Sequence, residues 1–402
     1  MSDAMPMRSF YPLHGGVRHY AWGQRASQNS TPLIAELLQQ EPGDEPWAEL
    51  WLGAHVSLPS LVEMPDGSRH ALDQVIAEAP TEWLGAKGAA AKKQLAFLLK
   101  VLTCNVPLSI QIHPDAQSAC QLHSAHPEAY PDPNGKAEII IALEPFRALA
   151  CFREMADILG DLEAVQAFEP WLALWKHGEL SLKCLVETLF ALSAVPLVAM
   201  LNQAILELNA RKTALSPADT LFLSLNQEYP GDRVTLFAYL LNQVTLAPGQ
   251  ALFLAPNSPH AYLHGVGIEC TTNSDNVIRA GLTPKPVNVD TLLKTVQFDR
   301  VGYLRVIPEC MASGRGKVLE YQAPTEEFRL VFYHDADCDL ADHPDVPGIF
   351  LVVQGEAVLV DADGSRMIAS RGTSWIRPAA STRGRIEATK PDTIVVWAQT
   401  NF

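Results

Sequence analysis

The chain has 402 residues, enough for two or three domains, and its hydrophobic content of 48% is ample for buried cores. Its formal net charge of −15 argues against nucleic acid or an anionic membrane as a partner, because both are negatively charged. The cysteines lie far apart without a CxxC pair, which is typical of free thiols in a reducing compartment. The first residues lack the apolar core of a signal peptide, and the most apolar stretch, residues 189–201, is too short to span a bilayer. We therefore expect a soluble cytoplasmic protein.

From about residue 8 to residue 145, short β-rich runs alternate with Gly, Pro and Asp turns. Strands are expected around residues 98–102, 108–112 and 139–143. Short strands with this punctuation are typical of a sandwich or a jelly roll.

A helical pattern replaces the β-rich texture between about residues 152 and 223. The apolar residues that recur at helical spacing are Leu182, Leu185, Val186 and Leu189, then Leu197, Leu201, Ile205 and Leu208. Pro196 is expected to separate two helices, and Ser216 to cap a further helix. These apolar stripes favour a helical core over a cofactor site.

Strand signals return at residues 234–241 and 250–254. A last β-rich section runs from about residue 310 to residue 402, with a strand-turn-strand rhythm around Gly355. Periodicity alone therefore predicts a mainly β protein with a helical insert.

The segment SIQIHPD, residues 109–115, carries the strongest chemical signal. Gln111 and His113 are two residues apart, so a β-strand would place both on one face. Glu138 heads another strand-like run, and His260 follows a turn-forming Asn-Ser-Pro. An amide, a carboxylate and two imidazoles make a mixed N/O set suited to a catalytic zinc ion.

Several blocks across the chain together resemble type I phosphomannose isomerases, zinc-dependent cupin enzymes that interconvert mannose 6-phosphate and fructose 6-phosphate. The blocks are YAWG at 20–23, WAELWLGAH at 47–55, FLLKVLTCNVPLSIQIHPD at 97–115, YPDPNGKAEIIIAL at 130–143, SPHAYLHG at 258–265 and SDNVIRAGLTPK at 274–285. The resemblance implies a cupin jelly roll (double-stranded β-helix) made of residues 1–150 and 226–309. A helical insert at 151–225 would split it, and a second, degenerate cupin-like β-domain at 310–402 would follow it.

The resemblance also implies the site. One zinc ion per chain would be held by Gln111, His113, Glu138 and His260. His264 is left out, because Gly265 and Gly267 argue against a helix that would pair it with His260.

Contact with a sugar phosphate is expected from cationic and polar side chains that match the family's substrate positions. These are Ser109, Lys136, Arg279 and Lys285, with Asp275 in support.

The implied reaction passes through a cis-enediol(ate) and would link mannose metabolism or GDP-mannose supply to glycolysis. Arg279 would stabilise the developing negative charge. Glu269 and Lys100 are both candidates for the base, and the residues do not decide between them. A lysine in an apolar strand would have a lowered pKa, unless Lys100 extends to the sheet edge.

Many family members carry His-Lys-Pro-Glu where this chain has Gly135-Lys136-Ala137-Glu138, and we expect altered loop rigidity there. Two other classes stay open: a cupin oxygenase that uses a redox metal, and a sugar-phosphate-binding protein on an inactive isomerase scaffold. We expect a monomer without nucleic-acid or membrane partners.

Overall fold

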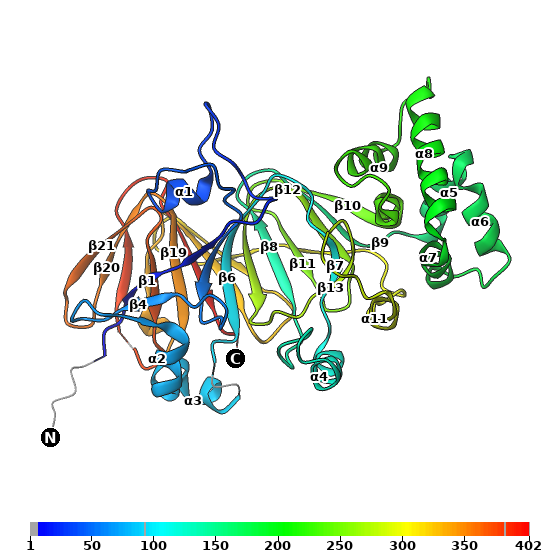
Figure 1. The fold of residues 1–402 in the computed structure, drawn as a ribbon. Coiled ribbons are helices and arrows are strands. Elements are labelled where there is room, and N and C mark those ends of the chain that lie inside the picture. Colours follow the sequence, from blue (N-terminus) through cyan, green and yellow to red (C-terminus); the bar gives the residue numbers. More distant parts are fainter. Residues whose placement is uncertain (1–6, 92–93, 382, 402) are drawn as a thin grey trace.

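The computed structural model describes residues 7–91, 94–381 and 383–401. Its fold is mainly β, with antiparallel sheets and several helices, and this confirms the prediction of a mainly β protein with a helical segment. Figure 1 shows the strands of the sheets side by side and one group of helices gathered beyond one end of them.

An 11-stranded sheet combines strands from both sides of the helical segment. Its main path runs through β14 (Leu304–Val306), β11 (Ala251–Leu254), β8 (Glu138–Ala142), β12 (His260–Thr272), β6 (Phe97–Cys104), β3 (Glu49–Gly53) and β2 (Gly16–Arg18). The strands that join it off this path are β7 (Ile110–Ile112), β9 (Phe146–Phe152), β10 (Leu241–Leu246) and β13 (Ile278–Gly281). The long strand β12 pairs with β6, β7, β8 and β9, so it connects most of the sheet.

A 9-stranded sheet contains most of the C-terminal part of the chain. Its order is β15 (Glu309–Met311), β16 (Lys317–Tyr321), β17 (Arg329–His334), β24 (Ile394–Gln399), β19 (Gly348–Gln354), β22 (Ser374–Arg377), β1 (Tyr11–His14), β4 (Leu61–Glu63) and β5 (Arg69–Ala71). A 4-stranded sheet consists of β18 (Cys338–Asp339), β23 (Arg385–Ala388), β20 (Glu356–Val360) and β21 (Arg366–Ser370). Strand β1 pairs with β22, so N-terminal residues complete a sheet that is otherwise C-terminal.

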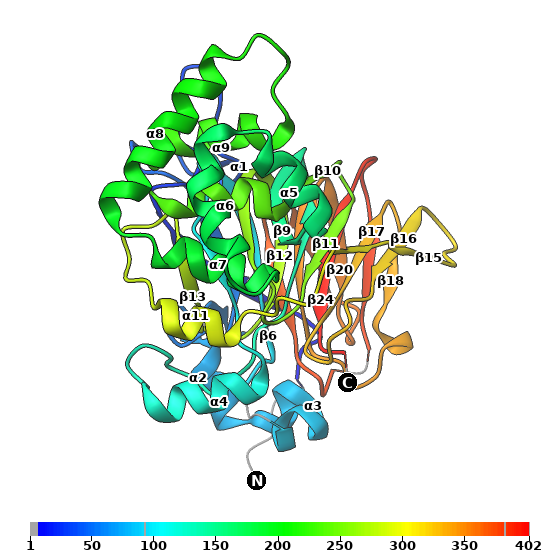
Figure 2. The same cartoon turned by 90° about the vertical axis from the view of Figure 1, so that its right-hand side faces the viewer.

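The helical segment follows β9. It contains α5 (Met155–Glu163), η1 (Gln166–Phe168), α6 (Glu169–Lys176), α7 (Leu182–Ala191), α8 (Ala194–Ala210) and α9 (Pro217–Glu228). The two predicted apolar stripes lie on α7 and α8, Pro196 lies in the first turn of α8, and Ser216 caps α9. Figure 2 shows these helices stacked against one another on the side of the sheets where β9 and β10 lie.

The strand predicted at residues 234–241 is wrong. The chain forms η2 (Arg233–Leu236) and α10 (Phe237–Leu240) there, and β10 begins only at Leu241. The Asp232 side chain accepts the backbone N–H of Val234 at 2.9 Å and so starts a helical turn. The apolar run is buried all round, which suits a short helix as well as a strand.

The other helices are α1 (Leu33–Leu37), α2 (Leu72–Glu78), α3 (Pro80–Ala91), α4 (Ala116–Ala125), α11 (Val289–Thr295) and η3 (Leu340–Asp342). In the described ranges no single helix is long and apolar enough to cross a membrane. Helices α7 and α8 together reach that length and composition, but the chain bends by 110° between them.

Candidate active site

His113, Glu138 and His260 bring their ligand atoms together inside the 11-stranded sheet. Nε2 of His113 lies 3.1 Å from Oε1 of Glu138, and Nε2 of His260 lies 3.4 Å from Oε2 of the same carboxylate. All three side chains are buried. His113 follows β7, Glu138 opens β8 and His260 opens β12. His260 pairs with Gln111, two residues before His113, and Glu138 pairs with Leu254 at the end of β11, the strand that leads into the turn before His260.

Each imidazole turns its Nε2 toward the carboxylate and its Nδ1 toward a backbone carbonyl. Nδ1 of His113 donates to the carbonyl of Asn276 at 2.9 Å, and Nδ1 of His260 donates to the carbonyl of Ser258 at 3.0 Å. In a neutral imidazole the other nitrogen then carries a lone pair. Burial lowers the pKa of His113 to about 4, although Glu138 attracts its proton.

The lone pairs and the carboxylate therefore need a cation between them. Nε2 of both histidines and Oε2 of Glu138 are buried without a hydrogen-bond partner in the described structure. The ligand atoms lie within 4.8 Å of one another. Two imidazole nitrogens and a carboxylate oxygen fit a divalent metal ion such as zinc. These three side chains therefore supply ligand atoms that suit a bound zinc ion.

Gln111 lies beside this cluster, as its spacing from His113 predicts. It is the cross-strand partner of His260, and the Ser109 hydroxyl donates to its Oε1 at 3.4 Å. The flanking Ile110 and Ile112 are completely buried in the apolar core, which confirms the alternation expected for this strand.

A cavity of about 490 Å³ adjoins the cluster. Its walls contain acidic, basic and neutral polar residues that the sequence singled out, namely Lys100, Ser109, Gln111, Lys136, Glu138, Glu269, Asp275, Arg279 and Lys285. Side chains more than 170 residues apart in the sequence thus surround one space.

Lys100 differs from the expectation. It lies in the middle of the sheet, in β6, and not at an edge, and only 7% of its surface is exposed. Its Nζ lies 2.9 Å from Oε2 of Glu269 and 3.7 Å from Oε1 of Glu49. Burial alone would lower the pKa of Lys100, but the carboxylates of Glu269 and Glu49 raise it above its ordinary value. The predicted lowered pKa is therefore wrong.

Three further cations surround the cavity in different ways. Lys136 is buried, and its Nζ lies 3.0 Å from Oε1 of Glu138. Arg279 is half-buried on β13, and its guanidinium forms no hydrogen bond or ion pair with any residue of the described chain. Lys285 lies at the rim, with its Nζ 5.8 Å from the ring centre of Tyr20. Burial lowers the pKa of Arg279, and in Lys285 the charge of Arg279 adds to this effect. Two cations without carboxylate partners suit an anionic ligand.

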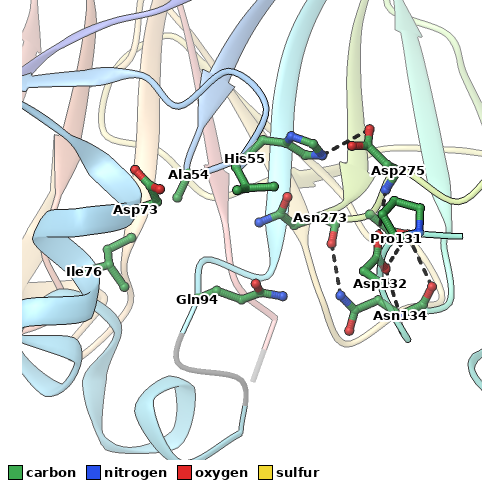
Figure 3. Close-up of a pocket in the computed structure, with 12 residues that line it drawn as sticks. Ala54, His55, Asp73, Ile76, Gln94, Pro131, Asp132, Asn134, Asn273 and Asp275 are labelled. Carbon is green, nitrogen blue, oxygen red and sulfur yellow. Dashed lines mark hydrogen bonds and ion pairs between the residues drawn. The ribbon is translucent and has the colours of Figure 1, made fainter. Parts of the chain in front are cut away.

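Asp275 lines this cavity and also a second cavity of about 290 Å³, whose lining residues Figure 3 shows. Its Oδ1 lies 3.3 Å from Nε2 of His55. Nδ1 of His55 accepts the backbone N–H of Ser57 at 3.2 Å, so the proton is on Nε2 and points at the carboxylate. Hydrogen bonding to His55 lowers the pKa of Asp275. His55 thus supports Asp275 and does not contact the His-Glu-His cluster.

Comparison with known proteins identifies the family. Residues 10–155 match the family described as phosphomannose isomerase type I, catalytic domain. The chain is 34% identical over 390 residues to mannose-6-phosphate isomerase 1 of Arabidopsis thaliana, with 88% of this chain and 87% of that protein covered. The chain belongs to the type I phosphomannose isomerase family.

Further members of the type I phosphomannose isomerase family support the assignment. The mannose-6-phosphate isomerase of Escherichia coli strain K12 is 33% identical, with 86% of this chain and 89% of that protein covered. The crystal structure of the Salmonella typhimurium enzyme, bound to its substrate F6P and a zinc atom, superimposes with a TM-score of 0.84. That structure is 29% identical and covers 98% of this chain and 100% of the other.

Cavity residues that sequence reasoning did not single out include Tyr20, Trp22, Glu49 and Trp51. The rings of Tyr20 and Trp22 stack with their centres 5.6 Å apart, and Nε1 of Trp51 donates to Oε2 of Glu49 at 2.8 Å. The signal was present, because both pairs stand in blocks that resemble the phosphomannose isomerases. Glu49 and Trp51 are also two residues apart on β3 and so share one face.

Gly135 lies in the loop where altered rigidity was expected from the sequence. A Cβ atom at this position would lie 2.6 Å from the backbone nitrogen of Ala116, at the start of α4. The loop before Glu138 therefore packs against α4 more closely than a larger side chain permits.

Proposed function

We propose that this protein interconverts D-mannose 6-phosphate and D-fructose 6-phosphate as a zinc-dependent aldose–ketose isomerase. One observation carries the proposal: two imidazole nitrogens and a carboxylate converge beside a cavity that holds two cations without ion-pair partners in the described chain. Relatives named mannose-6-phosphate isomerase support the choice of substrate.

One zinc ion would be held by Gln111, His113, Glu138 and His260. When bound, it supplies a Lewis acid that favours negative charge on the sugar oxygens. Lys136, 3.0 Å from Glu138, holds this carboxylate in its ionised form and extends the positive charge toward the cavity.

The phosphate group of the substrate would be bound by Lys285 at the rim and by the Ser109 hydroxyl. Arg279 is assigned to the developing enediolate, because its half-buried guanidinium has no carboxylate in the described structure to neutralise it. Asp275, which His55 orients, would bind the substrate by accepting a hydrogen bond from a sugar hydroxyl group.

The transfer of the proton from C2 to C1 is assigned to the pair formed by Lys100 and Glu269. The two side chains form one buried ion pair, so their protonation is linked. Burial raises the pKa of Glu269, and this makes it a stronger base than an exposed carboxylate, although Lys100 opposes the shift. Glu269 would take the proton, and Lys100 would balance the charge.

For the architecture, we propose the division expected from the sequence. A cupin jelly roll of residues 1–150 and 226–309 carries the site, residues 151–225 form the helical insert, and residues 310–402 form a degenerate cupin-like domain. Both segments of the first unit contribute strands to the 11-stranded sheet, which supports it. The monomeric state, the cytoplasmic location and the absence of nucleic-acid and membrane partners stay predictions.

A substrate panel tests the reaction. Purified zinc-loaded protein is assayed by coupled detection of the keto- or aldo-sugar product with mannose 6-phosphate, its C2 epimer glucose 6-phosphate, and unphosphorylated mannose. We expect turnover of mannose 6-phosphate only. Equal turnover of free mannose would contradict the roles of Lys285 and Ser109, and no turnover of any sugar would contradict the isomerase assignment.

A further inference from the structure

The carbonyl that orients His113 belongs to Asn276, a completely buried residue. The Asn276 side-chain amide donates to Oδ1 of Asp132 at 3.2 Å and to the Asp132 carbonyl at 2.7 Å. It also donates to the carbonyl of Asn134 at 3.0 Å. The position of the accepting carbonyl is therefore fixed by the loop that precedes Glu138.

Asp132 connects this loop to the segment after β12 at several points. Its Oδ1 also accepts the Ser274 hydroxyl at 2.8 Å, and its Oδ2 accepts the backbone N–H of Asp275 at 2.9 Å. Figure 3 shows Asp132 below Asp275, with a dashed line between them. Asp132 is only half-buried and is not one of the clustered ligand residues, yet every segment it joins carries or supports the site.

His260 has a similar support. Its Nδ1 donates to Ser258, and the preceding Asn257 donates from Nδ2 to Oδ2 of Asp115 at 2.8 Å. The backbone N–H of Asp115 returns a hydrogen bond to Oδ1 of Asn257 at 3.1 Å. Asn257 also donates its backbone N–H to the His113 carbonyl at 2.7 Å. Its φ of 63° lies in the left-handed region, which asparagine tolerates well.

We propose that Asp132 and Asp115 are positioning residues for the metal site. Asp132 anchors Asn276, whose carbonyl accepts the Nδ1–H of His113. Asp115 anchors Asn257, which precedes the Ser258 carbonyl that accepts the Nδ1–H of His260. The inference rests on the proposed zinc site and deepens it. Because each imidazole is held with its Nε2 lone pair inward, the ligands need not be ordered when the metal binds. Neither aspartate needs to touch the metal or the substrate for this effect.

The test measures zinc affinity and not turnover. Chelator-stripped full-length protein is titrated with Zn²⁺ in competition with a chromophoric chelator. We expect Asp132→Ala to weaken zinc binding about 10- to 100-fold, the usual effect of losing such a supporting contact. The matched control is Asp361→Ala. Asp361 is a buried aspartate that accepts Ser9 N and Ser9 Oγ at 2.9 and 2.7 Å, far from the site. The Asp361→Ala substitution should lower the unfolding midpoint without changing the zinc dissociation constant.

A mutant cycle separates positioning from general destabilisation. If Asp132 acts through Asn276, the Asp132→Ala/Asn276→Ala double variant should lose less zinc affinity than the sum of the single losses. The Co²⁺-loaded Asp132→Ala protein should also have an altered visible absorption spectrum, whereas Co²⁺-loaded Asp361→Ala should match the wild type.

If Asp132→Ala does not fold, Asp115→Ser decides the question at His260. Asp115 also caps α4 by accepting Ser118 N at 2.7 Å, and serine preserves such a cap while withdrawing the carboxylate from Asn257. Unchanged zinc affinity in a folded Asp132→Ala or Asp115→Ser variant, beside a wild type that binds zinc tightly, would overturn this inference alone. A folded wild type that binds no zinc would overturn the proposed function as well.

Discussion

Lys100 and Glu269 are direct cross-strand partners on β6 and β12, and their charged atoms lie 2.9 Å apart. Trp51, on β3, is the partner of Lys100 on its other side. This row of the sheet places an ammonium and a carboxylate at the wall of the cavity, with both side chains buried. The two base candidates are therefore one linked pair, and mutation of either residue changes the other.

Glu269→Gln should lower kcat by about 10²- to 10⁴-fold, because it removes the group that accepts the C2 proton. Lys100→Met should lower kcat to a similar degree, since the buried Glu269 then takes up a proton and loses its basicity. The loss of kcat in the Lys100→Met/Glu269→Gln double variant should be much smaller than the product of the two single losses. Steady-state kinetics with mannose 6-phosphate, at saturating zinc, measure all three.

The control for this pair is Lys183 and Glu187, an exposed i,i+4 pair on α7 with 3.9 Å between the charged atoms. Lys183→Met and Glu187→Gln should leave kcat unchanged, because exposed pairs contribute little. Retention of wild-type kcat by Glu269→Gln would remove Glu269 from the mechanism.

Arg279→Ala should lower kcat/KM by about 10²- to 10³-fold and leave zinc content intact. The guanidinium is half-buried without a hydrogen-bonding partner among the residues described, so its removal should not lower the unfolding midpoint. Kinetics, metal analysis and thermal unfolding on the same preparation check this. A large loss of stability would instead assign Arg279 a structural role.

The zinc-free protein should lose stability as pH falls from about 6.5 toward 4. The ordinary histidine pKa is about 6.5, whereas burial lowers that of His113 to about 4. Between these values the unfolded chain binds a proton that the folded chain does not, so lower pH favours unfolding. Urea midpoints measured with chelator present should fall across this window and fall less in His113→Gln. A midpoint independent of pH in both proteins would contradict the assigned neutral imidazole.

Gly135→Ala should destabilise the protein by about 1 to 3 kcal/mol, because its Cβ would meet the backbone of Ala116. Gly43→Ala is the matched control, since a Cβ there would meet nothing within 4 Å. Denaturant unfolding of the two variants measures the difference. Equal stability of both would show that α4 moves away from the loop without cost.

Sequence reasoning singled out the three clustered ligand residues and most of the charged groups around the cavity, because they stand in short blocks. The spacing of Gln111 and His113 indicates one strand face, and the family resemblance adds Glu138 and His260. The pKa of Lys100 was mispredicted, because the sequence shows its apolar neighbours along β6 but not Glu49 and Glu269 across the sheet. The helical turns at residues 233–240 were missed for a related reason: a short, fully buried apolar run has no periodicity to distinguish a helix from a strand.

The central claim is tested most directly by a coupled assay for fructose 6-phosphate formed from mannose 6-phosphate. The protein is assayed as purified, after removal of metal with a chelator, and after zinc is returned. We expect activity that disappears with the chelator and returns with zinc. A folded, zinc-loaded protein that forms no fructose 6-phosphate, or one that keeps full activity after verified removal of all metal, would contradict it.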